Sequence, residues 1–147
     1  MTTISLKDWG QSPPIVVGEA EHRRLTTAAL TDVANGASNS DFLLYELDRA
    51  RIVPDSLLPP DVIRLESVVR YRPIPGDERT IKLVLPEDAD SSGSYRLSVT
   101  SSHGAALLGL ETGAAMTWID AEGKVQRLKV LGVMNPASAG DPGPSAA

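Results

Sequence analysis

The spacing of apolar residues changes once along this chain, near residue 57, and the change divides the chain into two parts. Before that point, apolar residues recur three or four positions apart, which is the period of an amphipathic helix. Beyond it, apolar and polar residues alternate, which is the period of a half-buried strand. A helical N-terminal part and a strand-rich C-terminal part are therefore expected, which places the chain in the α+β class.

Two helices joined by a short polar turn are predicted in the N-terminal part. The first begins near Gly18, after a short β-branched run at 15–17 that we interpret as a lead-in strand. The second begins near Asp41, which we interpret as its cap, and ends at Pro54. The pair forms an antiparallel hairpin, or short coiled coil, that reaches only about 20 Å. The inward face of the first helix is an imperfect apolar stripe of Leu25, Ala28, Ala29, Asp32 and Val33, and the apolar face of the second comprises Phe42, Leu43, Leu44, Leu47 and Ala50.

The C-terminal part predicts a twisted antiparallel sheet wrapped around one helix. Turn signals stand at Gly76-Asp77 and at 120–123, where two strands can reverse direction. Glu87 and Asp88 follow a strand and are interpreted as an acidic helical turn. The five expected strands cover residues 62–71, 80–85, 95–99, 115–119 and 125–134.

The segment 101–113, S-S-H-G-A-A-L-L-G-L-E-T-G, predicts one short helix with both ends specified. Ser101 and Ser102 can accept hydrogen bonds from the first free backbone N–H groups. The run A-A-L-L favours a helix and is apolar enough to be buried. Gly109 can adopt the left-handed conformation that ends the helix, and Gly113 opens a turn before the next strand.

This segment resembles the signature of the C-terminal domain of the Gre transcript-cleavage factors, and more closely the regulator of nucleoside diphosphate kinase (Rnk) family. In the latter, G-A-A-L-L-G-L occurs as it stands at 104–110. The runs E-L-D-R-A at 46–50 and P-D-V-I-R-L-E-S-V-V at 60–69 are similar to the same family, in the same order. Two positions depart from it: Ser102 stands where the family usually has Pro, and Ala114 where it usually has Asp.

The resemblance implies an FKBP-like version of the antiparallel sheet, carried behind a shortened hairpin. It also implies a docking surface for bacterial RNA polymerase, near the secondary channel, around the turn before the motif helix. We further expect residues 60–136 to fold alone. The expected divisions are a flexible tail at 1–14, the hairpin at 15–56, the Gre-type domain at 57–136 and a disordered tail at 137–147. The docking residues by this resemblance are Ser101, Ser102, His103 and Gly104.

The hairpin tip argues against transcript cleavage. Gre factors carry two acidic residues at the tip of a long coiled coil, and these hold Mg²⁺ in the active centre of the polymerase. Here the turn reads N-G-A-S-N-S at 35–40 and contains no acidic residue. Asp32 and Asp41 only flank it, as a solvated or seam position and as a cap. The tip residues singled out are Asn35, Gly36, Asn39 and Asp41.

Composition narrows the remaining possibilities. The net charge is −5 and the isoelectric point is about 5.0, so a broad nucleic-acid-binding face is not expected. No cysteine is present, which excludes a disulfide, a thiolate metal site and a cysteine nucleophile. The sequence contains neither a signal peptide nor a spanning segment, so a cytoplasmic protein without a membrane partner is expected.

Candidate chemistry is sparse. His22 and His103 are interpreted as solvated, and the acidic run 87–90 lacks the ligand frame of a calcium loop. No catalytic residue, metal site or cofactor is therefore predicted. Arg23, Arg24, Arg49 and Arg51, with His22, can form a small basic face for RNA or an acidic polymerase surface, or can be ordinary helix-surface charges.

These observations predict a non-catalytic, Rnk-like regulator that binds RNA polymerase and affects nucleoside diphosphate kinase without stimulating transcript cleavage. The first alternative is a Gre-like fold that serves a different protein partner, since Ser102 makes the docking turn more polar than Pro would. The second is a prolyl isomerase of the FKBP type, which needs a pocket lined by several aromatic side chains. Aromatic residues make up only 4% of the chain, which disfavours that alternative.

Overall fold

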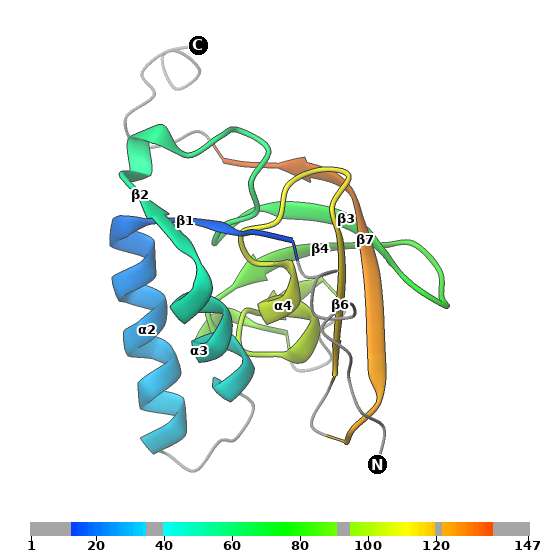
Figure 1. Cartoon of the computed structure of the whole chain (residues 1–147), viewed down its shortest axis with the longest axis horizontal. Helices are drawn as coiled ribbons and strands as arrows, with labels where there is room; N and C mark the ends of the chain where they lie inside the picture. The colour runs from blue at the N-terminus through cyan, green and yellow to red at the C-terminus, as the bar shows by residue number, and fades with distance from the viewer. Residues whose placement is uncertain (1–12, 35–39, 91–94, 120–121, 137–147) are drawn as a thin grey trace.

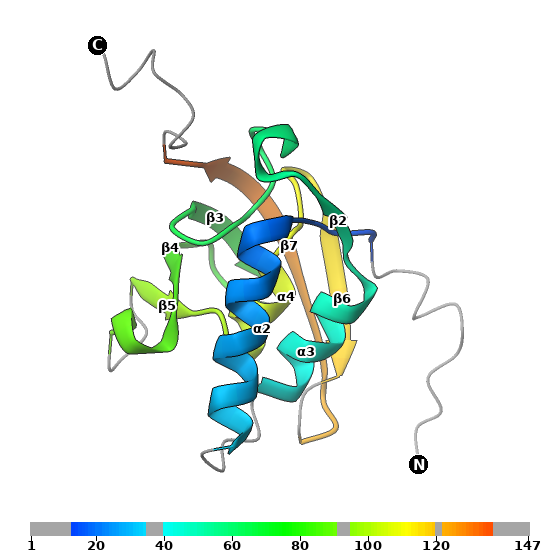
Figure 2. The same cartoon turned by 90° about the vertical axis from the view of Figure 1, so that its left-hand side faces the viewer.

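The computed structural model describes residues 13–34, 40–90, 95–119 and 122–136. These residues form an α+β fold in three layers: a helical hairpin, a short helix α4 (Ser102–Leu107) and a curled five-stranded sheet (Figure 1). Seen from the side, the hairpin lies in front of α4 and the sheet lies behind it (Figure 2). The predicted fold class is confirmed. The tails predicted at 1–14 and 137–147 lie outside the described residues, apart from residues 13 and 14.

The hairpin is bracketed by a small parallel sheet. Its elements are β1 (Val16–Gly18), α2 (Glu19–Ala34), α3 (Ser40–Arg49) and β2 (Arg51–Val53). Val17 pairs with Ile52, and the Arg51 N–H donates to the Ile15 carbonyl at 2.9 Å. The lead-in strand is thus confirmed, but the helix predicted to continue to Pro54 ends at Arg49. The β-branched residues that follow Arg49 pair with β1 instead of extending the helix.

The two helices bury the faces that their apolar spacing predicts, with exceptions near the tip. Leu25 and Leu43 are fully buried, but Val33, near the end of α2, is 39% exposed. The second helix begins at Ser40, so Asp41 lies in its first turn, favourably placed for the helix dipole, and is not the cap. The Ser40 hydroxyl donates to a carboxylate oxygen of Asp32 at 3.3 Å, which makes Asp32 a residue of the seam between the helices.

The larger sheet has the strand order β5-β4-β3-β7-β6. Its strands are antiparallel except for the pair β4–β5, which is parallel. The chain crosses from β4 to β5 through the short 3-10 helix η2, the acidic turn predicted after the strand, and this crossover reverses the expected direction of β5. The bounds are β3 (Val68–Pro73), β4 (Arg79–Val84), η2 (Pro86–Asp88), β5 (Arg96–Ser98), β6 (Ala115–Ile119) and β7 (Val125–Met134), with a second 3-10 helix, η1 (Asp55–Leu57), after β2.

The strand predicted from residue 62 begins only at Val68. A turn closes before it, because the Ser67 N–H donates to the Arg64 carbonyl and the Ser67 hydroxyl accepts from the Arg64 N–H. Glu66 lies in this turn with φ of 74°, a left-handed conformation that a strand cannot contain. Leu65, Val69 and Tyr71 are nevertheless buried on one side, as their alternation predicts.

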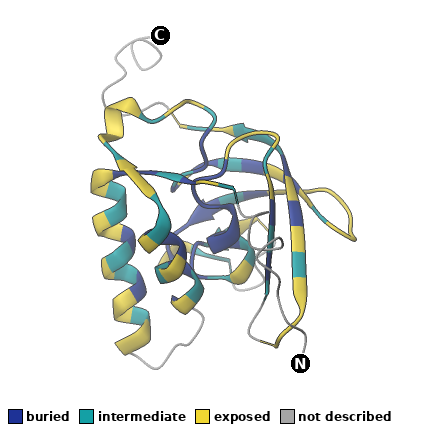
Figure 3. Cartoon of the chain, in the orientation of Figure 1, coloured by how far each residue is buried: buried dark blue, intermediate teal, exposed yellow. Residues whose placement is uncertain are grey.

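The two parts of the chain share one hydrophobic core. The buried cluster contains Leu25 and Leu43 of the hairpin together with Leu107 of α4 and Leu128 of the sheet. Figure 3 shows the buried residues gathered where α3, α4 and the inner side of the sheet meet. The hairpin also bonds to the sheet domain through Glu21, whose carboxylate accepts from the Leu65 N–H at 3.0 Å. Burial raises the pKa of this carboxyl, and the Leu65 bond partly offsets the effect.

Candidate functional site

The turn that leads into α4 is closed by short-range hydrogen bonds from serine and threonine. Ser101 caps the helix: its hydroxyl accepts from the Gly104 N–H at 3.0 Å and donates to the Ser98 carbonyl at 2.6 Å. The Ser98 hydroxyl in turn bonds the side chain and the N–H of Thr100. The cap predicted at Ser101 is confirmed. The turn is therefore held by hydrogen bonds of its own side chains, with Ser102 and no proline next to Ser101.

Gly104 is required by a close approach of two backbone segments. A Cβ at this position would lie 2.0 Å from the Ser98 carbonyl oxygen and 2.9 Å from the Ser101 hydroxyl. Both are well inside van der Waals contact, so no side chain fits without moving the turn. The glycine at the start of the G-A-A-L-L-G-L run is thus explained by packing.

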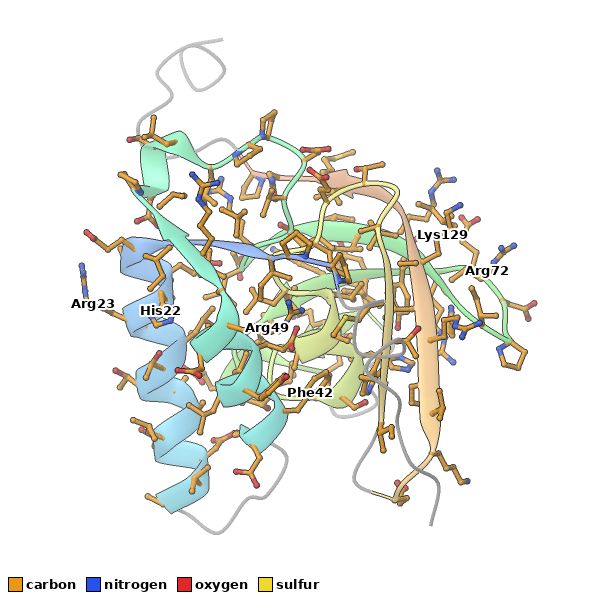
Figure 4. All side chains as sticks on the ribbon, viewed as in Figure 1. His22, Arg23, Phe42, Arg49, Arg72 and Lys129 are labelled. Atoms are coloured by element: carbon orange, nitrogen blue, oxygen red, sulfur yellow. The ribbon has the colours of Figure 1, made fainter. Side chains whose placement is uncertain are left out.

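Four aromatic rings pack in a row beside this turn. His103 makes edge-to-face contacts with Tyr71 and with Trp118, at centroid distances of 5.7 and 5.6 Å. Phe42 of α3 stacks on Trp118 at 5.9 Å. The Trp118 indole N–H donates to the Ser102 hydroxyl at 3.0 Å. The row therefore connects the hairpin to the start of α4 and to the sheet, as the position of Phe42 in Figure 4 illustrates.

His103 is part of this row and is not solvated, so that interpretation is wrong. Its Nδ1 lies 3.0 Å from the Tyr71 hydroxyl. Burial lowers the pKa of His103, and the nearby Arg79 guanidinium lowers it further. Burial raises the pKa of Tyr71, with Arg79 partly opposing. A neutral imidazole that accepts at Nδ1 from the Tyr71 O–H satisfies both groups.

The four predicted docking residues differ in what they present to a partner. Ser102 is exposed, Ser101 and His103 are half-buried, and Gly104 is buried. Of their side chains, Ser102 is therefore the one best placed for direct contact, while Ser101 and Gly104 maintain the shape of the turn. Two residues that sequence reasoning did not group with this turn lie beside it: Trp118, which donates to Ser102, and Arg79, whose guanidinium lies near His103.

The predicted hairpin tip is described in part. Asn35, Gly36 and Asn39 lie outside the described residues, while Asp41 is exposed in the first turn of α3. Phe42 is the next residue, and its contact with Trp118, which bonds Ser102, places the tip end of α3 on the same side of the molecule as the turn at 101–104. Phe42, the neighbour of Asp41 in the chain, is thus linked to Ser102 through Trp118.

The small basic face predicted on the helices is not assembled. The Nε2 atom of His22 hydrogen-bonds the Leu47 carbonyl oxygen at 2.9 Å. The prediction that His22 is solvated is therefore wrong. Arg49 points inward (Figure 4), where it makes two bonds of 2.8 Å to the fully buried Glu46 carboxylate and one to the Pro13 carbonyl. Arg23 forms an exposed ion pair with Glu19 at 3.8 Å. These groups serve the hairpin itself.

The acidic run after β4 has a structural use as well. One carboxylate oxygen of Asp90 accepts from the N–H groups of Tyr95 and Arg96, which fixes the start of β5. No group of three or more candidate metal-ligating side chains occurs within 13–34, 40–90, 95–119 and 122–136. In the same residues no helix is long and apolar enough to cross a membrane.

Comparison with known proteins gives consistent matches. Residues 58–135 match the family model described as "Transcription elongation factor, GreA/GreB, C-term". The chain is 33% identical over 131 residues to "Regulator of nucleoside diphosphate kinase" of Escherichia coli K12, covering 88% of this chain and 96% of that protein. The protein of the same name from Shigella flexneri matches equally.

A solved structure is similar over most of the chain. It is described as "Prokaryotic transcription elongation factor GreA/GreB from Nitrosomonas europaea". The TM-score is 0.63 and the sequence identity 33%, over 82% of this chain and 99% of the other. The match extends beyond residues 58–135, so the hairpin is part of the shared architecture.

Proposed function

Since the chain belongs to the GreA/GreB family of transcription elongation factors and is a Gre-like regulator, we propose that it binds bacterial RNA polymerase near the secondary channel. The observation that carries the proposal is the match to a regulator and to an elongation factor along nearly the whole chain. We propose the turn at 101–104 as the docking surface, with Ser102 as its contact residue. The same turn lies at the tip end of the hairpin, which suits joint engagement by both.

The proposed action excludes cleavage stimulation and any catalysis by the chain itself. Metal-assisted hydrolysis needs carboxylates that hold the ion, and the turn 35–40 contains none. The similar Escherichia coli protein is named a regulator of nucleoside diphosphate kinase. We propose that an effect on that enzyme follows from the regulatory role and needs no active site here.

The alternative is that the same turn binds a different protein partner. The exposed and polar side chain of Ser102 is compatible with such a partner. The isomerase alternative has less support. Phe42, Trp118, His103 and Tyr71 pack on one another, so their faces are used in mutual contact instead of lining a pocket for proline.

Competition with a cleavage factor tests the proposal. Stalled polymerase complexes receive a fixed amount of a Gre factor and increasing amounts of this protein, and cleaved transcript is measured. We expect no cleavage from this protein alone and progressive inhibition of the Gre factor, because shared docking lowers the free sites by mass action.

Two serine variants make the test specific for the docking turn. Ser102→Arg adds bulk and charge at the exposed position and should weaken inhibition. Ser56→Arg makes the same chemical change in η1, at another exposed serine, and should leave inhibition unchanged. Changes at Asn35 or Asn39 should matter less than Ser102→Arg. Cleavage by this protein alone contradicts the tip argument, and absence of inhibition at saturation contradicts the shared dock.

A further inference from the structure

Cations and anions are segregated in this acidic protein. The five strands of the larger sheet contain seven of the fourteen Lys and Arg residues of the chain and none of its nineteen Asp and Glu residues. The carboxylates lie on helices, turns and tails. The net charge of −5 therefore conceals a sheet that is entirely basic.

Six of these cations share one face of the sheet. Side chains alternate along a strand, and Val69, Tyr71, Leu128 and Val130 are buried toward α4. Their neighbours accordingly point the other way, and Arg72 and Lys129 stand together on the side away from the helices (Figure 4). Arg79 is the seventh cation and belongs to the inner side, beside Tyr71 and His103. We call the opposite side the outer sheet face; its cations are Arg70, Arg72, Lys82, Arg96, Arg127 and Lys129.

The strand register arranges these charges in a diagonal band across the outer sheet face, because Lys82 lies opposite Val68 of β3, four residues before Arg72. Arg72 lies directly opposite Lys129 on the neighbouring strand, and Lys82 lies opposite Arg96. Arg70 and Arg72 are two residues apart on β3, which is about 6.8 Å along a strand. Arg70 crosses toward β7, since its guanidinium nitrogens lie 3.8 Å from where a Cβ of Gly132 would be.

The centre of the band is not neutralised. At its margins, Lys82 pairs with Glu66 at 3.2 Å and Arg70 pairs with Glu78 at 3.5 Å, both in partly exposed contacts that water screens. Arg127 donates to the uncharged hydroxyl of Thr117. Within the described part of the chain, Arg72 and Lys129 have no carboxylate within ion-pair distance.

We propose that the outer sheet face binds the phosphate backbone of duplex DNA. An acidic protein surface is a poorer fit, because stable protein interfaces centre on buried apolar or aromatic anchors. Here the exposed apolar residues of β7 are single residues at its two ends: Val125, and Met134, which lies opposite Val68 at the Lys82 end of the band. Single-stranded RNA is also a poorer fit, because its binding relies on aromatic stacking platforms, which the band lacks. Backbone contact with a duplex needs only placed cations.

The proposal does not depend on the polymerase dock. It predicts weak, sequence-independent and salt-sensitive binding, which a dock on an elongating polymerase would strengthen by holding DNA nearby. The test measures the fluorescence anisotropy of a labelled 20-base-pair duplex with the full chain from 50 to 200 mM salt.

Two double variants with the same charge change decide the outcome. Arg72→Gln with Lys129→Gln should lower the association constant at 50 mM salt about tenfold or more, and reduce the slope of log K against log salt by about 2. Arg24→Gln with Arg51→Gln, at exposed cations of the hairpin side, should leave both unchanged. All four positions are exposed, so unchanged thermal unfolding is expected and is checked in parallel.

Five results would overturn the proposal. Four of them are no duplex binding at 50 mM salt, an equal loss with both pairs of substitutions, tighter binding of single-stranded RNA than of duplex, and tighter binding of polyglutamate than of duplex. The last of these would assign the face to an acidic protein. The fifth is a loss of duplex binding confined to the variant Arg24→Gln with Arg51→Gln, which would place the binding site on the hairpin.

Discussion

Two glycines with the same backbone conformation allow the energetic importance of the close contact between the hairpin segment and the sheet domain to be measured. Gly109 and Gly113 have φ of 79° and 90°. A Cβ on Gly113 meets nothing within 4 Å, whereas one on Gly109 would lie 2.7 Å from the Ile15 Cβ and 3.2 Å from the Val16 carbonyl oxygen. Alanine at either position bears the left-handed penalty, but alanine at 109 also presses on the segment that leads into β1.

The expected losses follow from these two contributions. The left-handed conformation costs an alanine roughly 1–2 kcal/mol, from which about 0.4–1 kcal/mol of unfolded-state entropy is recovered. Gly113→Ala should therefore lower the free energy of unfolding by at most about 1.5 kcal/mol. Overpacking adds about 1–3 kcal/mol, so Gly109→Ala should lose about 1–4.5 kcal/mol, which is about 1–3 kcal/mol more than Gly113→Ala. The Val16 N–H bond to the Gly109 carbonyl, 3.3 Å long, should weaken with it.

Urea denaturation followed by far-ultraviolet circular dichroism measures both variants under one set of conditions. The midpoint should fall further for Gly109→Ala than for Gly113→Ala, with unchanged slope for both. Equal losses, within about 0.5 kcal/mol, would mean that the Ile15 segment yields freely. The crowding argument would then be refuted, although the left-handed argument would survive.

Three other predictions concern the buried ion pair, the aromatic row and the division of the chain. Arg49→Ala leaves the Glu46 carboxylate buried without its partner and should cost about 3–5 kcal/mol in urea denaturation, while the exposed Arg51→Ala should cost nearly nothing. Because folding lowers the pKa of His103 below its ordinary 6.5, the unfolded chain binds more protons, so stability should fall as pH drops through 6.5 and level off below the folded pKa. That fall should vanish in His103→Gln, compared by thermal unfolding at pH 7.5 and 5.5; equal falls would contradict it. Residues 60–136 alone, expected from the strand pattern to fold by themselves, lose the hairpin side of the shared core, so their thermal transition should be less cooperative than that of the whole chain; an unchanged transition would show that the two parts fold independently.

The elements with long or doubly specified patterns could be predicted from the sequence. The helix at α4 has a serine cap and a left-handed glycine stop, and β7 alternates over ten residues, so both were found with nearly correct bounds. The pairing of β1 with β2 could not be found in this way. Each strand has three residues, which is too short to establish a period, and their parallel register is set by the hairpin between them.

Only part of the candidate site could be predicted from the sequence, because sequence rules describe residues that are close together in the chain. Local rules identified the turn at Ser101, because a cap bonds to backbone two or three residues away. They missed that His103 is half-buried, because Tyr71 and Trp118 reach it from two distant strands. The segregation of charge is present in the strand sequences, which contain Lys and Arg but no Asp or Glu, whereas the net charge of −5 averages over the whole chain.

Because β1 pairs with β2, the length of the hairpin can change while the two points that attach it to the sheet domain stay in place. The chain leaves the body after Gly18 and rejoins it at Arg51, and both points are fixed by the same three-residue register. Seven residues added to each helix at the tip would lengthen the hairpin by about 10.5 Å and return its apolar face to within about 20° of its present direction. Neither anchor, nor the turn at Ser102, nor the sheet would have to move. A protein of this architecture can thus change how far its hairpin extends through insertions at the tip, while the rest of the fold stays unchanged.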